Sequence, residues 1–166
     1  MSVFQRLVRA IGERNSLKLI NLYPPYLGAG VRLKHASEDL SVIEMEMPLR
    51  PWNQNFVGTQ FGGSLYSMCD PFFMLMVLTR LGGQFVVWDK SAAIDFLRPG
   101  RGTVTARFEV TAERLAQIRA EVEAAGKAHP RFEVDVVAED GERVARIAKV
   151  LSVRPKGYSS SKNRSV

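Results

Sequence analysis

The chain has 166 residues, of which 46% are hydrophobic and 24% charged, and this balance indicates one globular domain rather than a disordered or fibrous chain. Its single cysteine, Cys69, excludes an internal disulfide and a CxxC metal site. The net charge of +6 suits a polyanion, either nucleic acid or a phosphate-bearing small molecule. Neither a helix-turn-helix pattern nor interleaved basic and aromatic residues favours nucleic acid, so we expect no nucleic-acid partner.

The N-terminal segment predicts helices at residues 2–13 and 16–22, with Pro24-Pro25 ending the second. The first helix combines an apolar face with arginines, so it can dock on its own domain or lie on a membrane surface. Docking is favoured because the helix is short and contains Glu13. We read no secretory signal, and the longest apolar run, residues 71–78, is too short to span a bilayer. We therefore expect a cytoplasmic protein.

Two short strands are predicted within residues 27–47, the second from the alternation of Ile43, Met45 and Met47 with glutamates. Residues 48–60 read as a loop. From Gly63 the chain is apolar on nearly all sides of a helix, which must therefore be covered on most of them, and Gly82-Gly83 ends it.

The rest of the chain predicts further strands and one more helix. Strands are expected at 85–97, 103–110, 132–136 and 144–153, with a helix at about 113–126 and an Asp140-Gly141 hairpin turn before the last strand. The order predicts an α+β fold in which an antiparallel sheet of five or six strands wraps around one long central helix. The strand order within the sheet cannot be read from these patterns.

Residues 55–70 read N-x-x-G-T-x-F-G-G-S-L-x-x-x-x-D, and a later strand ends F-L-R-P-G. This combination resembles the hotdog-fold thioesterases, most closely the phenylacetyl-CoA thioesterase-like branch and its group known as a hotdog domain of unknown function. The resemblance covers residues 39–154, with 1–38 as an N-terminal helical extension and 155–166 as a flexible basic tail. It implies a homodimer or a dimer of dimers that hydrolyses an acyl-CoA thioester at the subunit interface, with no cofactor beyond the coenzyme A of the substrate.

The resemblance also implies roles for particular residues. Asp70, seven residues after Gly63, corresponds to the general base or nucleophile, and Asn55 to the residue that places water or the thioester. The backbone N–H groups of Gly62 and Gly63 correspond to the donors that polarise the carbonyl. Phe61 replaces the family's histidine, which favours the alternative of a non-catalytic acyl-CoA or lipid-binding sensor.

Several other side chains can bind substrate, although each also has a simpler interpretation. Ser64 and Thr59 can hydrogen-bond the substrate, and Phe61 is a further candidate for contact with it. Arg98 and Arg101 can meet the phosphates of coenzyme A. Helix capping explains Ser64 equally well, and exposure to solvent is the simpler interpretation of the two arginines. Asn53 and Asn55 can equally be turn residues. We interpret Cys69, Trp52 and Trp88 as packing residues, and His35 and His129 lie too far apart to indicate a metal site.

Asp70 itself leaves two readings open. Followed by Pro71, it is a good cap for a helix that begins there. The apolar pattern nevertheless starts at Leu65, so a longer helix that Pro71 interrupts is the alternative. In that helix Gly63 and Asp70 lie about 10 Å apart on one face, too far to act on one carbon, and a catalytic role would therefore require two chains paired about a two-fold axis.

Overall fold

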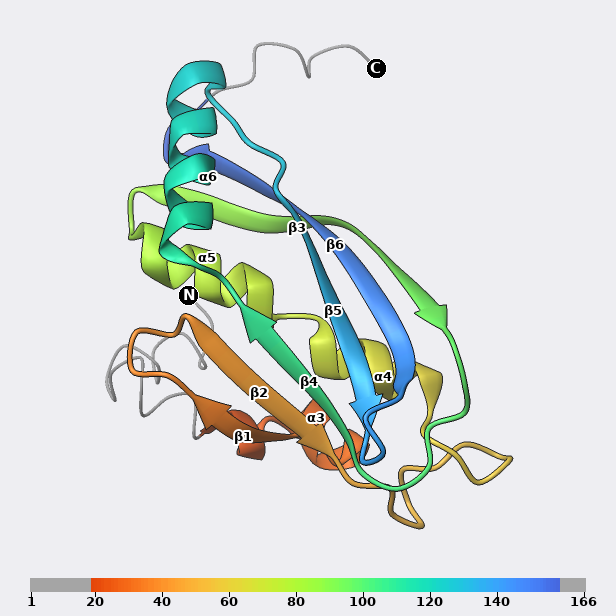
Figure 1. Cartoon of the computed structure of the whole chain (residues 1–166). Coiled ribbons are helices and arrows are strands. Elements are labelled where there is room, and N and C mark those ends of the chain that lie inside the picture. Colours follow the sequence, from red (N-terminus) through yellow and green to blue (C-terminus); the bar gives the residue numbers. More distant parts are fainter. Residues whose placement is uncertain (1–18, 159–166) are drawn as a thin grey trace, which may run out of the picture.

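The computed structural model describes residues 19–158, which form one antiparallel sheet with the strand order β1-β2-β4-β5-β6-β3 (Figure 1). The six strands among these residues are β1 (Arg32–Ala36), β2 (Val42–Met47), β3 (Phe85–Phe96), β4 (Val104–Glu109), β5 (Arg131–Ala138) and β6 (Arg143–Pro155). Each neighbouring pair is antiparallel, as expected. The sheet includes β1, which belongs to the segment that the resemblance leaves outside the hotdog pattern.

The central helix consists of two segments, α4 (Gly62–Cys69) and α5 (Phe72–Leu81), and the sheet curves around them (Figure 1). Its apolar side chains pack on the inner face of the sheet, where Phe72 and Phe73 contact Phe108 of β4. The helix begins before Asp70, is interrupted at Asp70-Pro71 and ends before Gly82, as the longer-helix reading predicts. The helix and the sheet together give the predicted α+β class.

Helix α6 (Ala112–Ala125) connects β4 to β5 and confirms the helix predicted at about 113–126. The Thr111 side chain caps it by accepting a hydrogen bond from the backbone N–H of Arg114. Gly126 ends it in the left-handed conformation, with φ of 73°. The apolar side chains of Leu115, Ile118 and Val122 are buried.

The N-terminal part of the described chain differs from the expectation. A short 3-10 helix, η1 (Leu19–Leu22), is followed by α3 (Pro24–Ala29). The prolines therefore begin a helix as well as follow one, because the first helical turn needs no N–H donor and the proline φ suits that position. The helix predicted at residues 2–13 lies outside the described residues.

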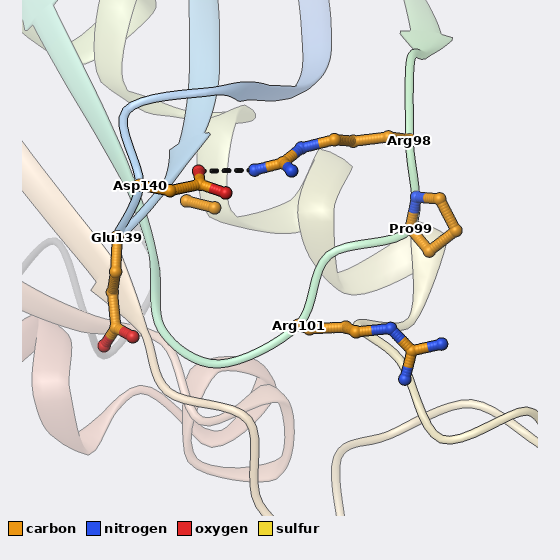
Figure 2. A pocket seen from close by; sticks show the side chains of 6 residues that line it. Arg98, Pro99, Arg101, Glu139 and Asp140 are labelled. Atoms are coloured by element: carbon orange, nitrogen blue, oxygen red, sulfur yellow. Dashed lines mark hydrogen bonds and ion pairs between the residues drawn. The ribbon is translucent and has the colours of Figure 1, made fainter.

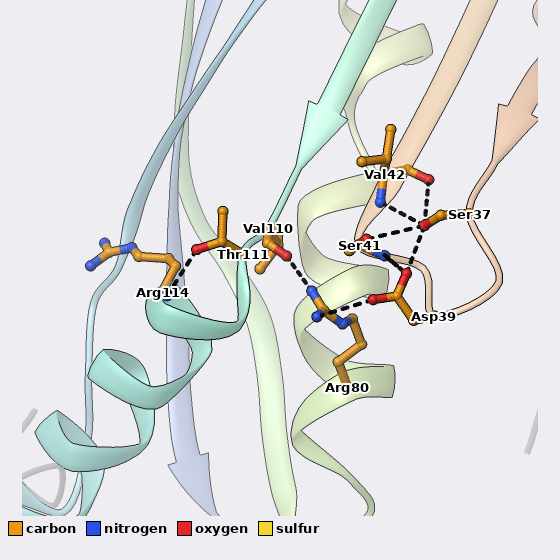
Figure 3. Close-up of polar contacts among 8 residues, drawn as sticks. All are labelled: Ser37, Asp39, Ser41, Val42, Arg80, Val110, Thr111 and Arg114. Carbon is orange, nitrogen blue, oxygen red and sulfur yellow. Dashed lines mark hydrogen bonds and ion pairs between the residues drawn. The ribbon is translucent and has the colours of Figure 1, made fainter.

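Arg80, in the last turn of α5, fixes the far end of the central helix (Figure 3). It donates a hydrogen bond to the carbonyl oxygen of Val110, after β4, and lies 3.6 Å from a carboxylate oxygen of Asp39, in the β1–β2 turn. Hydrogen bonds from Ser41 and Ser37 lower the pKa of Asp39 to about 2. These contacts join α5 to two separate strand ends.

Strand β3 forms one edge of the sheet, since among the strands of residues 19–158 it pairs only with β6. Its first residues are buried, but from Trp88 onward most of its side chains are exposed. Trp88 is 65% exposed and Phe96 is 59% exposed. A twelve-residue edge strand that presents large apolar side chains is a natural surface for pairing with another strand.

Candidate active site

Asp70 lies at the break between α4 and α5, and its side chain does not cap the second segment. Its Oδ1 accepts hydrogen bonds from the hydroxyl of Tyr66, at 2.8 Å, and from the ammonium of Lys149, at 2.9 Å. Tyr66 and Asp70 are four residues apart and therefore share one face of the helix. The capping interpretation of Asp70 is thus not supported, because both partners hold the carboxylate away from the first turn of α5.

Lys149 projects from β6 and its side chain is completely buried. Its ammonium donates to Asp70 Oδ1 and to the main-chain oxygen of Asp70, and on the other side to Asp89 Oδ1 at 2.9 Å. These contacts use all three N–H donors of the ammonium. Burial alone would lower the pKa of Lys149, but the hydrogen bonds to Asp70 and Asp89 outweigh it and raise that pKa. The lysine is therefore a buried cation between two carboxylates.

The second oxygen of the Asp70 carboxylate is open. The Asp70 side chain is 46% exposed, and Oδ2 has no hydrogen-bond donor within the described part of the chain. Burial, followed by the hydrogen bond to Asp70, raises the pKa of Tyr66, so its hydroxyl stays a neutral donor. One oxygen of the carboxylate is thus held in place while the other can receive a proton or attack a carbon atom.

The start of α4 provides unpaired donors. Phe61 occupies the N-cap position but makes no side-chain capping bond, and the N–H groups of Gly62 and Gly63 have no acceptor among residues 19–158. A Cβ atom at Gly62 would lie 3.0 Å from the ring of Phe96, and one at Gly63 would lie 2.6 Å from the ring of Phe61. Glycines therefore let two aromatic rings lie against a helix end that favours negative charge.

A surface cleft of about 500 Å³ lies beside this helix end. Phe61, Gly63, Ser64 and Ser67 line one side of it, and residues of α3 and the loop before α4, including Trp52, line the rest. The structure therefore brings three of the predicted site residues, Phe61, Gly63 and Ser64, to one cleft. Asp70 lies one turn beyond Ser67 on the same helix.

Asn55 and Thr59 organise the loop before α4. The Asn55 Oδ1 accepts from the N–H groups of Val57 and Thr59, and its Nδ2 donates to Thr59 Oγ1 at 2.9 Å. Both polar atoms of the Asn55 side chain are thus bonded within the loop, as in the turn-residue interpretation. Thr59 is buried, with its hydroxyl accepting from Asn55. Contact of these two residues with substrate stays a prediction.

Arg98 and Arg101 line a second pocket of about 400 Å³ (Figure 2). Arg98 is not free there, because its guanidinium lies 2.5 Å from Asp140 Oδ1 and this hydrogen bond lowers the pKa of Asp140. Figure 2 shows the Arg101 side chain extending away from that pair. With Glu139 also in the lining, this pocket has acidic as well as basic groups.

The remaining sequence interpretations have mixed outcomes. Cys69 is a buried core residue, as predicted, and burial raises the pKa of its thiol, so a thiolate nucleophile is disfavoured. The interpretation of the tryptophans as packing residues is wrong for the single chain, because Trp52 is 69% and Trp88 65% exposed.

No helix within residues 19–158 is long and apolar enough to cross a bilayer.

Sequence reasoning missed Lys149, Asp89 and Tyr66. A signal for the lysine was present, because β6 alternates and its inward positions around Lys149 are Ile147 and Leu151, both completely buried. A lysine in such a row is buried and needs a charged partner. Asp89 follows Val87 at an inward position of β3, next to a bulge in the pairing with β6. The pairing of β3 with β6, which brings the two residues together, could not be read from the patterns.

A model of the family described as "Domain of unknown function (DUF4442)" matches residues 12–153. No match was found among curated proteins. A protein of unknown function from Pseudomonas aeruginosa, PA5026, described as a probable thioesterase, superposes with a TM-score of 0.77 and 23% identity, over 87% of this chain and 96% of its own.

Two further solved structures resemble the chain. The thioesterase HI1161 from Haemophilus influenzae has a TM-score of 0.62 and 18% identity, over 85% of this chain and 90% of its own. A mutant of the thioesterase SAV0944 from Staphylococcus aureus has a TM-score of 0.58 and 13% identity, over 79% of this chain and 98% of its own. At these identities the likeness establishes the fold, and the predicted hotdog architecture is confirmed.

Proposed function

The chain belongs to the DUF4442 family, and from this premise we propose that it hydrolyses an acyl-CoA thioester at a site shared between two subunits. The observation that carries the proposal is the Asp70 carboxylate, which Tyr66 and Lys149 hold by one oxygen at an exposed break in the central helix. A carboxylate that serves only as a helix cap would instead bond to backbone N–H groups. The thioesterase descriptions of structurally similar proteins agree with this reaction.

The chemistry requires a base or nucleophile and donors for the developing oxyanion. As a base, Asp70 Oδ2 takes a proton from water while the water oxygen bonds to the thioester carbonyl carbon. The C–S bond then breaks, and coenzyme A leaves as a thiol that takes up the proton. As a nucleophile, the same oxygen bonds to the carbon, and the C–S bond breaks to release coenzyme A as a thiolate. Water then hydrolyses the resulting anhydride to the free acid and protonated Asp70, which passes its proton to the thiolate.

The N–H groups of Gly62 and Gly63 are the proposed donors to the oxyanion. They are unpaired in the described chain and lie at the positive end of the α4 dipole. One such donor contributes about 3 kcal/mol to transition-state stabilisation in a well-studied protease. Asn55 contributes indirectly in this account, because its bonds shape the loop that leads into the helix.

The two halves of the machinery belong to different subunits in our proposal. Two turns of one helix separate Gly63 from Asp70, a distance of about 10 Å, so one chain cannot easily apply both to the same carbonyl. The exposed edge of β3 supports a two-fold pairing that continues the sheet from one subunit into the next. Such a pairing can place Asp70 of one subunit opposite the helix start of its partner.

The cleft beside α4 is the proposed place for the acyl or pantetheine portion, with Ser64 and Phe61 in contact with it. The phosphates of coenzyme A can meet Arg101, which forms no ion pair within the described chain. Arg98 can join it only in competition with Asp140. The sequence resemblance to the phenylacetyl-CoA thioesterase-like branch makes phenylacetyl-CoA the first thioester to assay.

The direct test follows free thiol during incubation with aromatic and aliphatic acyl-CoA thioesters of several chain lengths. We expect turnover by the wild-type protein, and a loss of at least about 10³-fold in kcat for Asp70→Asn with binding retained, because the amide can neither accept the proton nor attack. Asp135→Asn is the matched control, since it removes a carboxylate that pairs with Arg146 on the sheet instead. Full activity in Asp70→Asn would contradict the proposal.

A second candidate, a non-catalytic acyl-CoA or lipid-binding sensor, draws on one observation. Phe61 stands in place of the family's histidine, and its ring lies over Gly63 at the helix start. A phenyl ring cannot donate a hydrogen bond to a carbonyl. Tight binding of thioesters without turnover at any chain length would favour the sensor.

A further inference from the structure

Lys149 is shared almost symmetrically between two carboxylates of different elements. Asp70, at the helix break, and Asp89, on the edge strand β3, each place one oxygen 2.9 Å from its ammonium nitrogen. The lysine side chain has no exposure, whereas the Asp70 side chain is 46% and the Asp89 side chain 33% exposed. The cation therefore cannot turn to solvent, while both carboxylates can.

The other titratable groups facing this cluster are neutral near physiological pH. They are Tyr66 on α4, Cys69 at the end of α4, and Tyr26 on α3. Burial raises the pKa of all three, and proximity to Asp70 raises each further. The cluster thus carries one positive and two negative charges when both aspartates are ionised.

We propose that Lys149 is a positioning residue that fixes the Asp70 carboxylate at the helix break, and that Asp89 tunes the reactivity of Asp70 by sharing the same ammonium. The proposal rests on the function proposed above. A lysine paired with Asp70 alone would form a neutral pair and make the carboxylate a weaker base. The second carboxylate leaves the cluster with a net negative charge and offsets that loss.

Two charge-removing variants are expected to move Asp70 in opposite directions. Lys149→Met keeps the length of the side chain but leaves two carboxylates facing each other, so Asp70 should take up its proton at a higher pH than in the wild type. Asp89→Asn leaves the lysine to Asp70 alone, so Asp70 should take it up at a lower pH. A lysine that only fills space would give neither shift, since neither change alters the packing volume much.

The titration of Asp70 can be followed without any turnover. We would label the aspartate side-chain carboxyl carbons with ¹³C, assign the Asp70 resonance as the one lost in Asp70→Asn, and measure its midpoint in the wild type and both variants. Asp135→Asn, with its carboxylate paired to Arg146 instead, is the control and should leave the Asp70 midpoint unchanged. Circular dichroism and thermal unfolding would establish that each variant folds.

If Lys149→Met does not fold, Asp89→Asn still tests the sharing, because its carboxylate is partly exposed at the sheet edge. The proposal is supported if the Asp70 midpoint moves up in Lys149→Met and down in Asp89→Asn. If Lys149→Met does not fold, a downward shift of the Asp70 midpoint in Asp89→Asn supports it. Unchanged midpoints, or shifts of one sign, would overturn it.

Steady-state rates then separate this inference from the function on which it rests. With turnover present, the acid limb of the kcat/KM profile should move up in Lys149→Met and down in Asp89→Asn, with kcat changing more than KM. If the wild type shows no turnover, the proposed hydrolysis fails, while the carboxyl resonances still decide the role of Lys149. If both variants turn over substrate and the acid limb stays at its wild-type pH, the proposed hydrolysis stands, but the proposed tuning of Asp70 is contradicted.

Discussion

The glycines that begin α4 matter for their backbone rather than for any side chain. Gly62 follows Phe61, whose backbone is extended with φ of −70° and ψ of 126°, and this geometry is the one preferred before a proline. Gly62 also occupies the first helical position, where a proline costs no intrahelical hydrogen bond. A proline at position 62 therefore removes one N–H donor with little damage to the helix.

We predict that Gly62→Pro lowers kcat for thioester hydrolysis by about 10²- to 10³-fold, because it removes one donor to the oxyanion. Gly62→Ala is the matched control, since it keeps the N–H and adds a Cβ that meets the Phe96 ring at 3.0 Å. Stopped-flow detection of free thiol under saturating substrate measures kcat in both. Equal rates in the proline and alanine variants would show that this N–H does not contribute.

The candidate site residues form two groups: those that the sequence could identify and those that only the structure reveals. Asp70 and the glycines lie within one short motif, so spacing and resemblance were enough to select them. Lys149 and Asp89 come from strands that are distant in sequence, and only the β3–β6 pairing brings them to the helix break. The contact of Arg98 with the phosphates of coenzyme A stays a prediction, and its pairing with Asp140 depends on a hairpin conformation that local pattern does not give.

At the scale of elements, the break between α4 and α5 exposes main-chain oxygens that side chains then satisfy. Pro71 has no N–H, so it cannot donate to the carbonyl oxygen of Ser67 as a regular helix would require. That oxygen accepts from the backbone N–H of Asp70 at 3.4 Å and from the hydroxyl of Tyr26, on α3, at 3.2 Å. Lys149 donates to the carbonyl oxygen of Asp70. The break therefore connects α3, the central helix and β6.

We predict that Tyr26→Phe lowers the free energy of unfolding by about 1 kcal/mol, because it leaves the Ser67 carbonyl without its side-chain donor. In a Pro71→Ala background the same change should cost less, since the substituted alanine supplies a backbone N–H to that oxygen. Urea denaturation of the two single variants and the double variant gives the coupling energy. An identical cost of Tyr26→Phe in both backgrounds would contradict this account.

The elements themselves follow from short-range pattern, with one instructive exception. Alternation located β2 and β4, and helical periodicity located α5 and α6, because in each case one face of the element packs on the core. Pro24-Pro25 was interpreted only as the end of a helix; η1 does end before them, but the prolines also begin α3. The same φ restriction that prevents a proline from lying inside a helix suits the first helical turn, and the sequence alone does not separate these cases.

At the scale of the whole molecule, the single chain leaves an unfinished sheet. Within residues 19–158, the outer edge of β3 has no strand partner, Trp88 and Phe96 are exposed on this strand, and Asp89 pairs with Lys149. Pairing this edge with its copy in a second chain would cover the apolar side chains and set two helix breaks on either side of one interface. Strand order could not be predicted from the sequence, so this edge became visible only in the structure.

Mixed dimers test the central claim most directly. Gly62→Pro and Asp70→Asn chains carrying different affinity tags are co-expressed, and dimers containing one of each are isolated. If Asp70 of one subunit acts with the helix start of its partner, one of the two sites is intact, and the mixed dimer should recover about half of the wild-type activity. A mixed dimer that is as inactive as either homodimer would contradict a site shared between subunits.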